Sequence, residues 1–258
     1  MSAVPDIALS LRHVSKSFFG LQVVTDVSFD VLRGQRTALI GPNGAGKTTV
    51  FNLVSGAFGV DQGEILLDGT NIAPLSPGKR ATMGLARSFQ NIRLMPHLSV
   101  VENVMVGQHA RTRGLMDLLT PLWLPRNRVW REEAEAQLRA FGLETYPNEV
   151  TANLPYGIRK KIEVVRALMS HPKVLLLDEP AAGLNTRETA ELKDFLLDVA
   201  ERGVTLLVVE HDMSLVRSLC DHTVVLNFGR KIYDGPTAEV QNDPGVLEAY
   251  LGPRHDAA

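Results

Sequence analysis

The chain has 258 residues, a formal net charge of −2 and 45% hydrophobic residues, which suits one compact globular domain. This charge balance excludes both the strong basic field of a nucleic-acid binder and the acidic bias of a disordered chain. The single cysteine, Cys220, excludes intramolecular disulfides and four-cysteine metal sites, and fits a reducing cytoplasm. No apolar run approaches the roughly 18–20 residues that span a bilayer, so we expect any membrane role to be peripheral.

The first third of the chain predicts strands and one strand–loop–helix unit. Short apolar-rich runs predict strands at Ile7 to Val14, Val27 to Val31, Thr37 to Ile40 and Gly63 to Leu67. The first two indicate an antiparallel edge. The third strand runs directly into a glycine-rich loop, and Thr49 to Ser55 then indicates a helix.

The rest of the chain changes from helix to alternating strand and helix. From Ser76 to about Leu168 the pattern is mostly helical and interrupted by prolines, which predicts an inserted helical subdomain. Continuous apolar runs then predict strands buried in a parallel sheet at Val174 to Leu177, Val204 to Val209 and Thr223 to Leu226. Helices are expected at Glu188 to Glu201, at Met213 to Cys220 and from Asp243-Pro244 to Gly252.

The glycine-rich loop fits the pattern G-x-x-x-x-G-K-[ST] with Gly41, Pro42, Asn43, Gly44, Ala45, Gly46, Lys47 and Thr48. Glycine lets the backbone turn its N–H groups inward, and these donors with the following helix N-terminus form a nest for phosphate oxygens. Lys47 is expected to reach the β- and γ-phosphates and the Thr48 hydroxyl to ligate Mg²⁺, with Thr49 beside them in the ATP-binding set. A chance match in a chain of this length occurs roughly one time in a hundred.

A second candidate site, formed by two acidic residues, lies at the end of the strand predicted at Val174 to Leu177. Asp178 and Glu179 follow it directly, and ligands of parallel sheets bind at the carboxyl ends of strands. We expect Asp178 to hold Mg²⁺ and Glu179 to act as the base that polarises the attacking water. Taken alone, the pair could equally be an ordinary strand end before a turn at Pro180; the phosphate loop makes the catalytic interpretation the stronger one.

Together these motifs resemble the nucleotide-binding subunits of ABC transporters along essentially the whole chain. The resemblance implies ATP and Mg²⁺ as ligands and a P-loop NTPase core. It also implies that Gln90 is the Q-loop glutamine near the metal and water, that His211 is the switch histidine at the γ-phosphate, and that Phe18 stacks on adenine. Phe19 is adjacent, and a plain core role competes for either ring.

Two further segments resemble family motifs with departures. The segment Leu154, Pro155, Tyr156, Gly157 and Ile158 stands where the signature LSGGQ is usual, and in the family it acts in trans on the partner's ATP. Pro155 removes the serine hydroxyl donor, so we hypothesise a weakened half-site, which the ATPase rate of Pro155→Ser in the full complex would test. Ala182, Gly183, Leu184 and Asn185 resemble the D-loop, with Asn185 in place of the usual aspartate.

The fold expected from these elements is one α/β ABC ATPase domain over residues 1–258. Its mainly parallel core and antiparallel β edge subdomain comprise 1–75 and 171–258, and its helical subdomain comprises about 76–170. Within this division, 111–135 is an insertion and 237–258 is a C-terminal tail.

The branch of the family follows from longer resemblances. Ala86 to Leu94, Val101 to His109 and Ala249 to Gly252 are similar to the ATPases of branched-chain amino-acid importers, and Arg111 to Arg131 looks like the insertion of the larger of the two. That resemblance implies a second homologous ATPase, or a second copy, in a head-to-tail dimer. It also implies two transmembrane permeases, an extracytoplasmic solute-binding protein and a peripheral place at the cytoplasmic face of the inner membrane.

Three alternatives remain open from the sequence. An export ATPase, such as one for lipopolysaccharide, has a similar core, although the insertion disfavours it. A non-transport ABC ATPase that works on DNA or ribosomes would usually carry two ATPase domains, a coiled coil or a basic surface. A nucleotide-gated module without turnover is disfavoured by Glu179 and His211 and weakly favoured by Pro155.

Overall fold

The computed structural model describes residues 6–88, 92–111 and 125–251. Its core sheet has the strand order β10-β9-β3-β8-β7-β6. The strands are β3 (Arg36–Ile40), β6 (Leu85–Arg87), β7 (Val174–Asp178), β8 (Thr205–Val209), β9 (His222–Asn227) and β10 (Arg230–Pro236). All neighbouring pairs are parallel except β9 and β10, so the core is the mainly parallel sheet that the sequence predicts.

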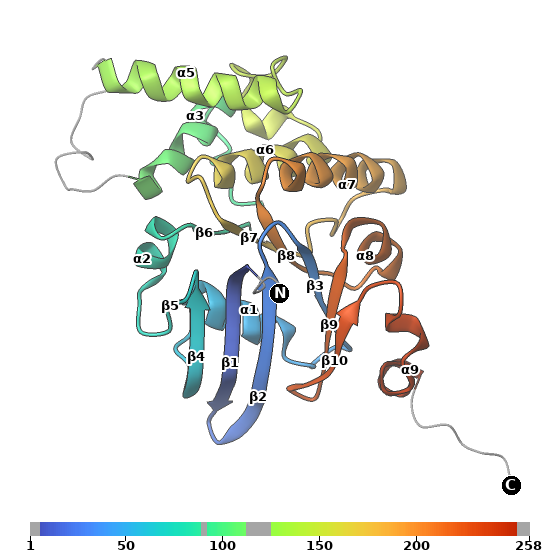
Figure 1. Ribbon diagram of the computed structural model, residues 1–258. Helices are drawn as coiled ribbons and strands as arrows, with labels where there is room; N and C mark the ends of the chain where they lie inside the picture. Colours follow the sequence, from blue (N-terminus) through green and yellow to red (C-terminus); the bar gives the residue numbers. More distant parts are fainter. Residues whose placement is uncertain (1–5, 89–91, 112–124, 252–258) are drawn as a thin grey trace, which may run out of the picture.

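A second, antiparallel sheet has the order β2-β1-β4-β5. Its strands are β1 (Ile7–Phe18), β2 (Leu21–Leu32), β4 (Gln62–Leu67) and β5 (Thr70–Asn71). The strands β1 and β2 are longer than expected because the chain reverses at Phe19 and Gly20, both with positive φ, in a two-residue hairpin turn. This sheet lies at the opposite end of the molecule from α3, α5 and α6 (Figure 1).

The α-helices are α1 (Lys47–Ser55), α2 (Pro77–Thr82), α3 (Val100–Val106), α5 (Pro125–Ala140), α6 (Tyr156–Leu168), α7 (Thr186–Glu201), α8 (Met213–Leu219) and α9 (Pro244–Leu251). Short 3₁₀ turns are η1 (Gly107–Arg111), η2 (Thr151–Asn153) and η3 (Val240–Asn242). Helix α9 begins as expected, with Asp243 accepting a hydrogen bond from the Val246 N–H at 2.9 Å. Gly252, the expected end of this helix, lies outside the described residues.

Apolar clusters cover both faces of the core sheet. Alternate residues of each strand point to opposite faces and so belong to different clusters. On one face, Leu39 and Leu207 pack with Phe51 of α1 in a cluster shared with the antiparallel sheet. On the other face, Ile40 packs in a cluster with Ile162 of α6 and residues of α7 and α8. This double burial explains why the core strands read as continuous apolar runs.

The stretch that the sequence predicts as mostly helical contains one strand of the core sheet. Strand β6 pairs Ala86 with Leu175 of β7, although Ser76 to Leu168 was expected to be helical. Three residues are too short to show a period, which is why sequence patterning missed β6. The antiparallel edge strand β10 was missed as well. Within the described residues, no helix is long and apolar enough to cross a membrane.

Candidate functional site

The strand register brings the phosphate loop and the acidic strand end to the same edge of the sheet. Strand β8 lies between β3 and β7, and its Val209 is the register partner of both Leu39 and Asp178. The carboxyl ends of β3 and β7 are therefore level. They are two strand spacings apart, roughly 10 Å.

The phosphate loop is held in a shape that glycine permits. Gly41 packs so closely on strand β9 that a Cβ there would lie 2.1 Å from the Leu226 carbonyl oxygen. Gly44 and Gly46 both have positive φ, and a Cβ at Gly44 would meet open space. The loop therefore satisfies the backbone conditions for a phosphate nest at the start of α1.

Lys47, the first residue of α1, folds back over this loop. Its Nζ donates to the carbonyl oxygens of Gly41 at 2.6 Å and Pro42 at 3.0 Å. Partial burial lowers the pKa of Lys47, and the nearby charge of Glu179 opposes that shift. The Lys47 ammonium is thus within electrostatic reach of Glu179 at the acidic strand end.

Glu179, the first residue after β7, has a backbone conformation that is rare for a non-glycine residue. Its φ is +45°, and its N–H donates to the Val209 carbonyl at 2.9 Å. The His211 Nδ1 lies 4.0 Å from the Glu179 Oε1, and the imidazole is largely exposed. The structure therefore brings the predicted base and the predicted switch histidine together.

Asp178 is buried and has a partner that the sequence analysis did not identify. The Arg87 Nη2 donates to the Asp178 Oδ2 at 2.6 Å, while Arg87 Nη1 donates to Asn52 Oδ1 at 2.7 Å and Ser55 Oγ at 3.0 Å. The sequence could have indicated Arg87 as a partner of Asp178 only through its place on β6, the strand next to β7. Strand β6 was itself not predicted.

Glu210 is a second residue that was missed. Its carboxylate is 2% exposed and accepts the N–H groups of Ala181 at 3.0 Å and His211 at 3.2 Å. Burial raises the pKa of Glu210, partly offset by these hydrogen bonds. Glu210 therefore holds the backbone in two places, at Ala181 beside the D-loop and at His211, the predicted switch histidine.

The signature segment opens α6, with Pro155 as its N-cap residue. Leu154 and Gly157 are buried, and a methyl group added at Gly183 would lie 3.3 Å from the Tyr156 Cε1. The signature and the D-loop are therefore in contact within one chain. Ile158 follows in the first turn of α6.

The D-loop ends as the cap of α7. The Asn185 Oδ1 accepts the Glu188 N–H at 3.0 Å, and the Glu188 carboxylate accepts the Asn185 N–H at 3.1 Å. The side-chain oxygen of Asn185, which an aspartate would also offer as an acceptor, therefore already accepts a hydrogen bond within this chain. Ala182 and Leu184 each donate a backbone hydrogen bond inside the loop, to Glu179 and Ala181.

The remaining predicted residues are placed only in part. Phe18 is partly buried and packs edge-to-face on Phe58 at 5.2 Å, while the adjacent Phe19 is fully exposed at the hairpin tip. Gln90 and most of the insertion, residues 112–124, lie outside the described residues. Thr48 is exposed in the first turn of α1, and Thr49 is half-buried beside it.

We expect the buried Glu210 carboxyl to make stability depend on pH. Its folded pKa is raised, so the folded state holds a proton that the unfolded state has released, and stability falls as pH rises from the ordinary glutamate value through the folded pKa. Relative to Glu210→Gln, the wild-type protein should therefore lose free energy of unfolding as the pH rises above the ordinary glutamate pKa of about 4, measured by urea titration at a series of pH values.

The surface variant Glu201→Gln is the control for the loss of one carboxylate. If the free energy of unfolding of the wild type instead rose relative to that of Glu210→Gln with rising pH, the assigned direction of the Glu210 shift would be wrong.

Comparison with known proteins agrees with this geometry. The sequence pattern of the family described as "ABC transporter" matches residues 24–182, and that of "Branched-chain amino acid ATP-binding cassette transporter" matches residues 230–254. The chain is 41% identical to the high-affinity branched-chain amino acid transport ATP-binding protein BraF of Pseudomonas aeruginosa, over 95% of this chain and 97% of BraF. It is 37% identical to LivG of Escherichia coli K12 with the same coverage.

The lipopolysaccharide export ATP-binding protein LptB of Haemophilus influenzae is 33% identical over 95% of this chain and 97% of LptB. Among solved structures, a nucleotide-free ATP-binding cassette of an ABC transporter superposes with a TM-score of 0.85 at 28% identity, covering 96% of this chain and 100% of that one. The ADP conformation of the cassette MJ1267 gives the same TM-score and identity, over 96% of this chain and 99% of that one. The chain therefore belongs to the ABC transporter family of ATP-binding subunits, in the branch that resembles the branched-chain amino-acid transporters.

Proposed function

We propose that this chain binds ATP with Mg²⁺ on the loop Gly41–Thr48, hydrolyses it, and powers uptake of branched-chain or other hydrophobic amino acids through separate permeases. The observation that carries the catalytic part is the shared partner Val209, which puts the ends of β3 and β7 level. The transported class rests on the relatives BraF and LivG, which are more similar to this chain than the export protein LptB is.

The donors at the site fit a magnesium ion. The Thr48 hydroxyl and the Asp178 carboxylate are oxygen ligands, which hard cations prefer, and both stand at the edge where the phosphate loop opens. When bound, the ion would neutralise charge on the phosphates. Gln90 remains the third expected ligand by family resemblance alone.

Different residues of this chain bind the phosphates, activate the attacking water and contact the γ-phosphate. Lys47 exchanges its two loop carbonyls for phosphate oxygens, which are stronger acceptors because they are charged. Glu179 orients the attacking water and takes its proton, and His211 donates to the γ-phosphate from beside it. The signature Leu154–Ile158 supplies the α6 N-terminus to the ATP of a head-to-tail partner.

The partners and place of the protein complete the proposal. By analogy with its relatives, the chain pairs with a second, homologous ATPase or with itself. The pair then docks on two permeases at the cytoplasmic face of the membrane. An extracytoplasmic solute-binding protein delivers the cargo to the opposite face of the permeases. The described residues after Gln90 pack against α6, where Arg166 donates to the Arg93 carbonyl at 2.6 Å, so motion of α6 would be transmitted to that surface.

For adenine stacking, the geometry favours Phe19 over the predicted Phe18. The ring of Phe18 already packs on Phe58, whereas Phe19 is free to cover a base. The hairpin that carries both rings adjoins the phosphate loop, since a Cβ at Gly46 would lie 3.0 Å from the Val23 carbonyl. We therefore assign the stacking role to Phe19.

Phe19→Ala should weaken ATP binding about tenfold, because stacking on an aromatic ring is worth roughly 1–3 kcal/mol per base. Phe18→Ala should mainly lower the free energy of unfolding, because it removes the contact with Phe58. Calorimetric titration of both variants with ATP and Mg²⁺ measures the difference. Weaker binding in Phe18→Ala together with unchanged binding in Phe19→Ala would restore the original assignment.

Glu179→Gln tests the proposed chemistry. The variant should bind ATP as the wild type does and release phosphate at least 100-fold more slowly in the assembled transporter, since general bases contribute roughly 10²–10⁴-fold. Lys47→Ala should instead lose tight ATP binding. Phosphate release by Glu179→Gln at the wild-type rate would exclude Glu179 as the base.

A further inference from the structure

Arg87 joins three elements through one guanidinium group. From strand β6 it donates to Asp178 at the end of β7 and to Asn52 and Ser55 on α1, at 2.6, 2.7 and 3.0 Å. Its side chain is 13% exposed and that of Asp178 is 11% exposed, so solvent competes little for these bonds. Charge-assisted hydrogen bonds with little solvent competition are the strong ones.

The guanidinium is planar, so its bonds fix directions as well as distances. One amino group is committed to the Asp178 carboxylate, and the other is committed to α1. The orientation of the carboxylate is thereby tied to α1, whose first two residues are Lys47 and Thr48. The two expected sides of the metal site, Thr48 and Asp178, are linked through Arg87.

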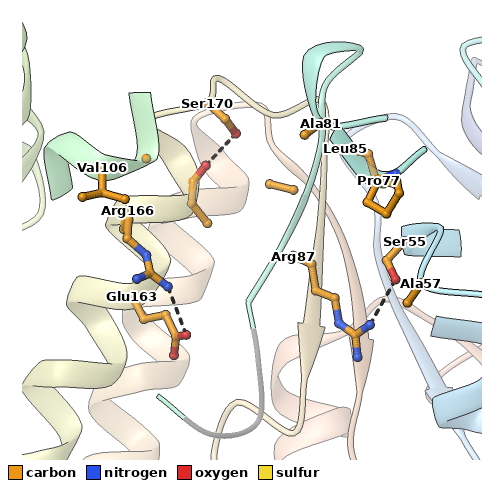
Figure 2. Close-up of a pocket in the computed structure, with 13 residues that line it drawn as sticks. Ser55, Ala57, Pro77, Ala81, Leu85, Arg87, Val106, Glu163, Arg166 and Ser170 are labelled. Atoms are coloured by element: carbon orange, nitrogen blue, oxygen red, sulfur yellow. Dashed lines mark hydrogen bonds and ion pairs between the residues drawn. The ribbon is translucent and has the colours of Figure 1, made fainter. Parts of the chain in front are cut away.

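Arg87 also reaches a groove away from the nucleotide edge. A cavity of about 510 Å³ separates α1, α2 and β6 from α6 and η1, and Arg87 lines one wall while Glu163 and Arg166 line the other (Figure 2). Arg166 and Glu163 form their own ion pair at 3.4 Å. The same side chain therefore borders the groove and holds Asp178.

We propose that Arg87 is a positioning residue that fixes the Asp178 carboxylate for Mg²⁺ relative to the phosphate-loop helix. This rests on the proposed ATPase function. Arg87 itself touches neither nucleotide nor metal in this account.

The test measures the Mg²⁺ requirement of ATP binding, in the full-length protein, by titrating Mg²⁺ at fixed ATP. Arg87→Met should raise the Mg²⁺ concentration for half-maximal binding about tenfold and leave metal-free ATP binding in EDTA unchanged, because only the metal carboxylate loses its support. Arg87→Lys should give a smaller shift, since it retains the charge and loses the planar fork.

Two further variants separate this role from general stabilisation. Asn52→Ala removes one anchor of Arg87 without touching Asp178, and should shift the Mg²⁺ requirement in the same direction by a smaller factor. Arg166→Met, on the opposite wall of the groove, should leave it unchanged. If Arg87→Met does not fold, Asn52→Ala decides the outcome.

The proposal is overturned if the Arg87 and Asn52 variants keep the wild-type Mg²⁺ requirement, or if they weaken binding equally with and without metal. The second result would mean that Arg87 only stabilises the fold. If the wild-type protein did not bind ATP at all, the proposed function itself would be refuted. Failure of the Arg87 proposal and failure of the proposed function therefore give different results.

Discussion

The site depends on a backbone constraint, the parallel pairing of β3 and β7 on either side of β8. Val209 is the register partner of both Leu39 and Asp178, so a slip of either strand would move the phosphate loop past the acidic strand end. Apolar side chains cover both faces of the sheet, which prevents such a slip. Level strand ends allow a triphosphate on the loop to share one ion with Asp178.

Buried charge surrounds this edge of the sheet on several sides. Arg87 approaches Asp178 from β6, and Glu210 holds the backbone beside His211. Lys160 of α6 is 4% exposed, and burial lowers its pKa while Glu163, Glu210, Glu179 and Asp178 oppose the shift. A cation of α6 therefore interacts electrostatically with the carboxylates at the ends of β7 and β8 of the same chain.

The sequence predicted the fold where the signal was local and missed it where the signal was not. The loop Gly41–Thr48, the strand before Asp178 and the cap at Asp243 each carry a short-range pattern, and all three lie as expected. Strand β6 has only three residues, so neither it nor the reach of Arg87 to Asp178 could be predicted. The choice between Phe18 and Phe19 depends on which ring packs on Phe58, a contact between residues far apart in the sequence that residue types alone do not determine.

The central claim is that the phosphate loop and Asp178 hold one metal–triphosphate between them. Mn²⁺ in place of Mg²⁺ allows a direct test by pulsed electron paramagnetic resonance of the ATP-loaded protein, which detects ³¹P nuclei next to the ion. The account predicts phosphorus coupling in the wild-type protein, and Mn²⁺ binding at least tenfold weaker in both Thr48→Val and Asp178→Asn. Wild-type Mn²⁺ affinity in Asp178→Asn would contradict it, because the acidic strand end would then take no part in the site.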